Sequence, residues 1–353
     1  MMVSMWLRLA LPCVWVTCSL IALGQAPRPQ EPHPPFPYVE EEVTYANPQA
    51  SGVKLAGTLT EPKTGGPFAA VLLVTGPGPL DRDETTAGHK PLLVLADYLT
   101  RRGMAVLRVD RRGVGKSSGN FEKATTQDFA SDAAAGVQYL LSRSDINPKH
   151  IGIIGHGEGG IIAPMVAAEV PDKVSFLVLL AGTAVPGEEV LIAQTERAEK
   201  AAGIPDDQIK ADKKIGKLVY DAVREGKRTV DIPDELQEYA DSWQRQLPRF
   251  KSPWVRFFLA YDPAPTLEKV RCPVLALYGS KDMQLDPEQN ASAMKAAFAR
   301  GGNREATVEI LPGLNYMFQK ADTGLGWEYA TISESISPDV LKTIGDWIAA
   351  RTS

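Results

Sequence analysis

Short, continuously apolar segments alternate with amphipathic helical segments along most of this chain of 353 residues. Segments such as Ala69–Thr75 and Phe176–Leu180 lack the polar alternation of a half-exposed strand, which is typical of strands buried on both faces of a parallel sheet. Strands separated by helices favour an α/β fold with a mostly parallel central sheet and helices on both faces. The predicted strands are Val43–Tyr45, Val53–Thr60, Ala69–Thr75, Ala105–Val109, Ile151–Ile154, Phe176–Leu180, Pro273–Tyr278 and Thr307–Leu311, of which the first two form an N-terminal β-hairpin, and the predicted helices include Pro91–Arg102, Asp128–Ser142, Ile161–Ala168 and Pro338–Arg351.

The chain divides into five predicted segments. An apolar run from Leu9 to Leu23 follows the single charge of Arg8, so residues 1–24 resemble a signal peptide for secretion or export to the periplasm, with an uncleaved anchor as the alternative. Residues 25–38 are rich in proline and predict an extended, unfolded spacer. The α/β pattern fills residues 39–186 and 262–353. Residues 187–261 are helical and rich in charge, and their insertion between two strands predicts a lid.

Composition excludes several classes of partner. The net charge of −5 offers no electrostatic attraction to nucleic acid or to an anionic membrane surface. After removal of the signal peptide we expect no stable membrane insertion, and only Cys272 remains, so no internal disulfide can form. Four histidines without ligand spacing give no case for a structural metal, and we expect no cofactor. Oligomeric state is left open.

The most informative motif is Gly155-His156-Gly157-Glu158-Gly159. It follows an apolar strand and precedes a helix, which is the setting of the G-x-S-x-G nucleophile elbow. Gly157 stands where that motif has serine, so the nucleophile is missing. Glycine tolerates the strained backbone that an elbow needs, so the frame can persist without the hydroxyl.

A nucleophilic hydrolase also needs a base, an acid that orients the base, and N–H donors for the oxyanion. Asp282 follows the strand Pro273–Tyr278, where the acid of an α/β-hydrolase triad is found. No histidine occurs after His156, so the base is missing from the carboxyl-terminal part of the chain.

Several long motifs carry a closer resemblance; they are GPGPLDRDE (76–84), GHKPLLVLADYLTRRG (88–103), RGVGKSSG (112–119), GHGEGGIIAPM (155–165), SPWVRFFLAYDPAPTLEKVRCPVLALYGSKD (252–282) and PGLNYMFQ (312–319). From about Glu40 onward the chain resembles bacterial secreted α/β-hydrolases of the serine-aminopeptidase-like or esterase-like kind. The resemblance implies a G-H-S-E-G-G elbow, in which Gly157 replaces serine, and a G-L-N-H turn, in which Tyr316 replaces the base. It also implies oxyanion donors at the N–H of Glu158 and in the loop after strand Ala69–Thr75. In that loop Pro77 has no N–H to give, and Gly78 is the alternative donor.

Other charged and aromatic residues fit structural roles. We expect the side chain of His156 to point away from the nucleophile position and the run Asp81–Glu84 to brace its loop with ion pairs. Trp243 and Trp254 are expected to pack the lid on the core.

The sequence therefore predicts an α/β-hydrolase whose chemistry is impaired, retaining a site for a small acyl or ester-type ligand or for a partner. One alternative is an active ester or acyl hydrolase with a non-standard site. A distant alternative is dinucleotide binding, because residues 155–160 also satisfy G-x-G-x-x-G, although two or more predicted strands precede them.

Overall fold

The computed structural model describes residues 28–227, 229–246, 250 and 252–352, and the expected signal segment 1–24 lies outside them. The described strands form one eight-stranded sheet in the order β1-β2-β4-β3-β5-β6-β7-β8. The strands β1 and β2 pair antiparallel, β2 pairs antiparallel with β4, and the other neighbours are parallel. The predicted α/β fold with an N-terminal hairpin is confirmed. The strands are β1 (Tyr38–Ala46), β2 (Lys54–Pro62), β3 (Phe68–Val74), β4 (Ala105–Val109), β5 (Ile146–His156), β6 (Phe176–Leu180), β7 (Val274–Gly279) and β8 (Ala306–Leu311).

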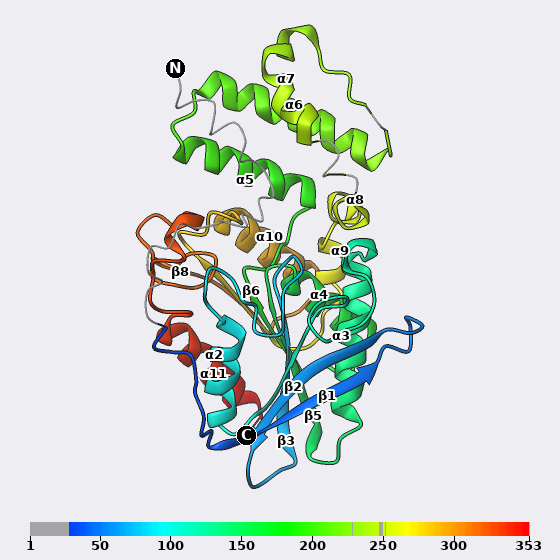
Figure 1. The fold of residues 1–353 in the computed structure, drawn as a ribbon, viewed down its shortest axis with the longest axis vertical. Helices are drawn as coiled ribbons and strands as arrows, with labels where there is room; N and C mark the ends of the chain where they lie inside the picture. Colours follow the sequence, from blue (N-terminus) through cyan, green and yellow to red (C-terminus); the bar gives the residue numbers. More distant parts are fainter. Residues whose placement is uncertain (1–27, 228, 247–249, 251, 353) are drawn as a thin grey trace.

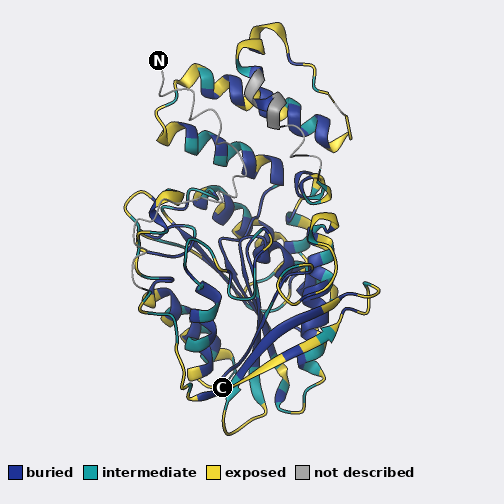
Figure 2. Cartoon of the chain, in the orientation of Figure 1, coloured by how far each residue is buried: buried dark blue, intermediate teal, exposed yellow. Residues whose placement is uncertain are grey.

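The centre of the sheet is buried on both faces. Every residue of β6 and β7 is buried, whereas β1 exposes most of its residues along the sheet edge (Figure 2). This contrast follows from the sequence, because β6 and β7 are almost wholly apolar and β1 carries three successive glutamates.

Helices cover both faces of the sheet. The helices α2 (Pro91–Arg101) and α11 (Pro338–Thr352) contact each other on one side, and α3 (Thr126–Leu141) and α4 (Gly159–Glu169) contact each other on the other side (Figure 1). The helix α10 (Pro287–Arg300) packs against β7 and β8.

Local capping explains where these helices begin. Proline at the first position opens α2, and Thr125 and Asp128 form a reciprocal capping box at the start of α3. Asp286 caps α10 by accepting a hydrogen bond from the N–H of Gln289.

A helical insertion separates β6 from β7. It contains α5 (Gly187–Ala201), α6 (Asp206–Arg224), α7 (Gln237–Gln246) and α8 (Pro253–Ala260), followed by the short α9 (Ala264–Leu267). In Figure 1 the helices α5, α6 and α7 stand beyond one end of the sheet. Arg197 of α5 donates to the carbonyl oxygen of Asp282 at 2.5 Å, so the insertion is fastened directly to the turn that follows β7.

The amino-terminal spacer differs from its prediction. The guanidinium of Arg28 donates to four backbone carbonyls, those of Ala87 and Gly88 in one loop and Ala330 and Ile332 in another. Gln30 adds two hydrogen bonds: its side-chain amide donates to the carbonyl oxygen of Ile336 and its side-chain oxygen accepts from the N–H of Ser335, so the segment is fixed against the core. Residues 28–30 therefore differ from the unfolded spacer expected, because the guanidinium of Arg28 can donate to several backbone carbonyls at once.

In the described part of the chain, no helix has the length and apolar character that crossing a bilayer requires.

Candidate functional site

The elbow forms where β5 ends and α4 begins. Gly157 adopts a φ of +51°, in the left-handed region that side chains disfavour. Its N–H donates to the carbonyl oxygen of Leu180 at 2.8 Å, which fixes the turn against β6. A Cβ on Gly160 would lie 2.5 Å from the Cα of Gly182, so this glycine allows α4 to pack against the chain leaving β6. The glycine spacing at 155–160 thus serves the packing of a strand–turn–helix elbow.

The space above Gly157 is filled by Tyr316. A Cβ built on Gly157 would lie only 1.9 Å from the Tyr316 hydroxyl oxygen and 3.0 Å from Cδ of Pro77. Contacts below 3 Å between such atoms do not occur without movement, so a serine at 157 and the present position of Tyr316 exclude each other. The residue expected at the base position therefore lies over the nucleophile position instead.

Asp282 is retained in the turn after β7 and is fully buried. Its Oδ1 accepts hydrogen bonds from the N–H groups of Gln284 at 2.7 Å and Leu285 at 2.9 Å. Its Oδ2 has no hydrogen-bond partner among the described residues. Burial raises the pKa of Asp282 to about 7, although the two backbone hydrogen bonds act in the opposite direction. The second oxygen thus lies idle where a triad acid would hold a histidine.

The expected oxyanion donors are split between an intact turn and an altered loop. Glu158 is the N-cap of α4, so its N–H lies at the elbow as predicted. Pro77 packs against Gly157 and presents Cδ there rather than a donor. Gly78 has a φ of +107° and its carbonyl accepts from the N–H of Leu80 at 2.8 Å; a donor role for its own N–H stays a prediction.

The side chain of Glu158 connects the elbow with three other elements. Its carboxylate accepts from Arg111 at 2.7 Å, from the Thr126 hydroxyl at 2.7 Å and from the indole N–H of Trp254 at 2.6 Å. Trp254 belongs to α8, so this buried carboxylate fastens the helical insertion to the elbow. The predicted packing of Trp254 on the core is confirmed, whereas Trp243 packs inside the insertion against Tyr220 and Phe250.

A second buried acid, Glu84, was not predicted to reach the elbow. Its carboxylate contacts Nδ1 of His156, and Nε2 of the same ring lies 3.0 Å from the carbonyl oxygen of Tyr316. The ring of His156 also packs on the ring of Tyr316, with centroids 4.4 Å apart. His156 is therefore directed toward the loops that carry Glu84 and Tyr316, and its ring packs on the residue that fills the nucleophile position, contrary to the expectation that it points away from that position.

The rest of the run Asp81–Glu84 braces its loop as predicted. Arg82 pairs with Asp110 at 2.8 Å and with Glu42 at 2.8 Å, and Asp83 pairs with Arg108. The sequence marked the run as charged, but only the fold brings Glu84 to a histidine 72 positions away.

Electrostatics leave the phenol of Tyr316 neutral. Burial, followed by the negative charges of Glu84 and Asp282, raises its pKa well above the ordinary value. A neutral phenol is a poor nucleophile, so the hydroxyl that occupies the elbow does not replace the missing serine. Cys272 is equally inert, because burial raises its thiol pKa to about 12.

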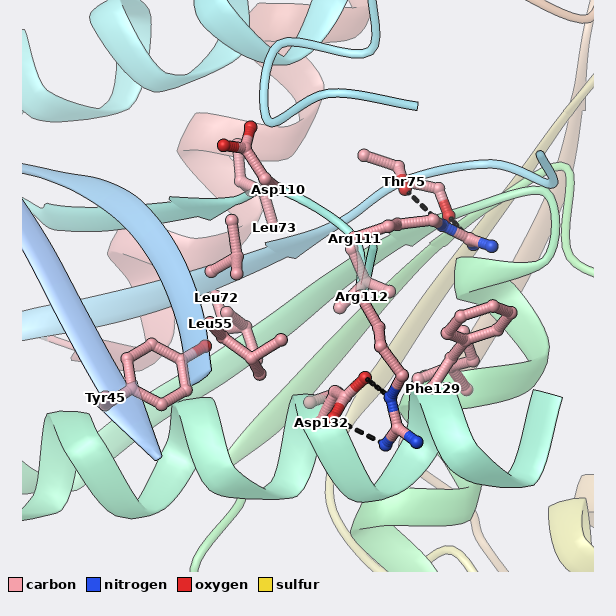
Figure 3. Close-up of a pocket in the computed structure, with 14 residues that line it drawn as sticks. Tyr45, Leu55, Leu72, Leu73, Thr75, Asp110, Arg111, Arg112, Phe129 and Asp132 are labelled. Atoms are coloured by element: carbon pink, nitrogen blue, oxygen red, sulfur yellow. Dashed lines mark hydrogen bonds and ion pairs between the residues drawn. The ribbon is translucent and has the colours of Figure 1, made fainter. Parts of the chain in front are cut away.

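A cavity of about 50 Å³ lies between the sheet and α3, and it is bordered by none of Gly157, Asp282 and Tyr316 (Figure 3). Arg112 and Asp132 form an ion pair beside it at 2.8 Å. This volume suits a few water molecules rather than a substrate.

Comparison with known proteins agrees with this geometry. A family model described as serine aminopeptidase, S33, matches residues 92–317. The esterase EstD of Thermotoga maritima is 26% identical over 269 residues, which are 74% of this chain and 58% of EstD. The chain thus spans little more than half the length of that relative. The putative hydrolase YtaP of Bacillus subtilis is 31% identical over 126 residues, covering 30% of this chain and 41% of YtaP.

Solved structures show the same fold. The structure of Est1E from Butyrivibrio proteoclasticus, determined with ferulic acid bound, superposes with a TM-score of 0.53 at 18% identity and covers 85% of this chain and 96% of Est1E. The Pyrococcus furiosus esterase Pf2001 superposes with a TM-score of 0.53 at 15% identity and covers 90% and 94% of the two chains.

Proposed function

This chain belongs to the serine aminopeptidase S33 family of α/β hydrolases, and on that premise we propose that it is a non-hydrolytic member. It keeps the hydrolase frame and binds a small acyl-type ligand or a partner without turning it over. The esterase activity of relatives such as EstD describes the ancestry of the site rather than its present chemistry.

One observation carries this proposal. The Tyr316 hydroxyl lies where the side chain of residue 157 would begin. Gly157 and Tyr316 thus leave the site without nucleophile and base, and the phenol fills the space where a nucleophile would stand. A triad without its nucleophile and base retains only the residual catalysis of binding and oxyanion stabilisation, about 10³–10⁴ over water. Pro77 lowers even this residual catalysis, because it supplies no N–H to the oxyanion beside Gly157.

The unpartnered oxygen of Asp282 supports the same reading. In a working triad both oxygens of the acid would be engaged, one of them by the histidine that it orients. Here Oδ1 caps a turn and Oδ2 is idle, so the retained aspartate has a structural use that does not depend on catalysis.

The test is hydrolysis of short-chain p-nitrophenyl esters by the purified protein, with Asp282→Asn as the matched variant. We expect no turnover above buffer for either protein and no labelling by a fluorophosphonate probe. Turnover by the unchanged chain that disappears in Asp282→Asn would establish the alternative, an active hydrolase with a non-standard site.

A further inference from the structure

His156 contacts a hydrogen-bond acceptor at each of its two ring nitrogens. Nδ1 faces the carboxylate of Glu84, and Nε2 faces the carbonyl oxygen of Tyr316 at 3.0 Å. A carbonyl oxygen can only accept, so Nε2 must carry a proton for that contact to be favourable. A neutral imidazole has a single N–H and cannot donate to two acceptors at once.

Two proton arrangements satisfy both contacts. Either the ring is an imidazolium beside an ionised Glu84, or Glu84 is protonated and donates to Nδ1 while the ring donates from Nε2. Both arrangements hold two protons in the unit formed by Glu84 and His156. When one proton leaves to solvent, the remaining proton stays between Nδ1 and the ionised Glu84, which is the stronger acceptor. The lone pair of Nε2 then faces the lone pairs of the Tyr316 carbonyl, and that contact is lost.

The surroundings favour retention of the second proton. Burial acts to lower the pKa of His156, but the charge and hydrogen bond of Glu84 outweigh it and the pKa lies above its ordinary value. The other groups facing the unit are Asp282 from the turn after β7 and Tyr316 from the segment after β8, and Tyr329 in turn faces Tyr316. Glu158 on the same elbow is already paired with Arg111.

A second buried histidine provides an internal contrast. His89 lies near the Ser335 hydroxyl and the carbonyl of Tyr329, without a carboxylate at either nitrogen. Burial lowers the pKa of His89 and keeps its ring neutral. The carboxylate of Glu84, rather than burial, is what sets His156 apart.

We propose that Glu84 and His156 form a proton-dependent latch on residues 312–319, which holds Tyr316 in the elbow while the second proton is bound and releases it when that proton is lost. The inference rests on the proposed function in one respect, that Tyr316 and not a nucleophile occupies the elbow. The latch then makes access to the elbow a function of pH, so that ligand or partner is admitted on the alkaline side.

Amide hydrogen exchange of the purified protein tests the latch without reference to activity. Protection of a peptide covering residues 312–319 is measured at pH 6 and pH 9, corrected for the intrinsic pH dependence of exchange, with a peptide covering β6 as the reference. We expect protection of residues 312–319 to fall about tenfold or more at pH 9, the effect of losing one charge-assisted hydrogen bond, while β6 is unchanged. An unchanged ratio between the two peptides would overturn the proposal.

The variant Glu84→Gln gives the decisive arm. Its amide can donate to Nδ1 while the neutral ring donates from Nε2 to the Tyr316 carbonyl, so the latch should stay closed at both pH values. The control Asp282→Asn removes the neighbouring titrating acid and should keep the pH-dependent fall. If Glu84→Gln still shows the fall, or if Asp282→Asn abolishes it, the control of Tyr316 lies elsewhere.

Nitrogen NMR of labelled histidines adds an independent reading. We expect Nε2 of His156 to be protonated at pH 6 in the unchanged chain and in Glu84→Gln, and to lose its proton at pH 9 in the unchanged chain alone, with His89 neutral in both. A neutral His156 in the unchanged chain, with an ionised Glu84, would refute the latch. Because neither experiment measures hydrolysis, the latch can fail while the ester assay still gives no turnover, and the reverse also holds.

Discussion

Two buried carboxylates face Tyr316 from different loops, and only one of them has a base. Glu84 contacts His156, whereas Asp282 accepts from two backbone N–H groups and contacts no base, and each acid has one oxygen without a partner among the described residues. The acid at the family's triad position is thus the unpaired one, and the paired acid lies in the loop after β3. Retention of an acid at a catalytic position therefore does not indicate retention of its catalytic partner.

The two acids differ in their surroundings. Glu84 lies against the ring of His156 and raises the pKa of that ring, while burial raises the pKa of Asp282 to about 7 and favours a proton on it. Ionisation of the buried Asp282 lowers the stability of the folded protein. An aspartate is still useful at this position because its Oδ1 accepts two backbone hydrogen bonds.

The paired side should be the more costly to break. Replacing Glu84 by alanine leaves His156 without its carboxylate and also opens a gap, so we expect the free energy of unfolding to fall by about 3 kcal/mol. Chemical denaturation at pH 6.5 measures this, with Glu122→Ala, an exposed glutamate on η1 (Phe121–Lys123), as the control. If the free energy of unfolding falls no more than in the control, the contact of Glu84 with His156 does not stabilise the protein and the two acids do not differ in this respect.

Tyr316, which lies between the two acids, is tested by Gly157→Ser. The new Cβ would lie 1.9 Å from the Tyr316 hydroxyl, so overpacking should lower stability by about 1–3 kcal/mol. Adding Tyr316→His should recover most of this loss and place a base next to Asp282, giving measurable labelling by a fluorophosphonate probe. A double variant that folds and stays unlabelled would show that Asp282 is not positioned to orient a base, or that Pro77 blocks the oxyanion site.

The unpaired side should respond in the opposite direction. Asparagine at 282 keeps the acceptor for Gln284 and Leu285 and removes the buried charge, so at pH 8 we expect Asp282→Asn to stabilise the protein by about 1–2 kcal/mol. The pKa of Asp282 is raised in the folded state, from 3.8 to about 7. The folded protein therefore binds more protons than the unfolded chain between those values, and stability declines as pH rises from about 4 to about 7. The stability gained with asparagine should vanish near pH 4. Thermal denaturation of both proteins across this pH range measures it, and a gain that stays constant from pH 8 to pH 4 would contradict the prediction.

A third buried carboxylate, Glu158, has three side-chain hydrogen-bond partners and so shows what losing one partner of several costs. Trp254→Phe removes one of these donors and leaves two, so a loss of only about 1 kcal/mol is expected. Since Trp254 belongs to α8, protease accessibility of the helical insertion should rise with little change in the core. If Trp254→Phe lowers the free energy of unfolding as much as Glu84→Ala, the number of hydrogen-bond partners does not determine how much each buried carboxylate contributes to stability.

Much of the fold was predictable because its signals are local. The runs β4 and β6 coincide with the predicted strands, and the positions of Gly157 and Asp282 follow from the strands that precede them. The contacts that define the site are not local. Nothing in the residues around Glu84 shows that its partner is His156, and the anchoring of Arg28 in two loops depends on carbonyls that only the folded chain brings together. That Tyr316 fills the elbow also escaped prediction, because substitution of a base does not reveal where the new side chain lies.

The contact between Gly157 and Tyr316 has a historical consequence. A serine returning at 157 meets the phenol, and a histidine returning at 316 finds no nucleophile to serve, so neither reversion is useful alone. On the proposed function the two positions are therefore epistatic, because restoring a nucleophile and a base takes both substitutions together. A frame held in this way can change what it binds by single substitutions, whereas hydrolysis would need two substitutions at once.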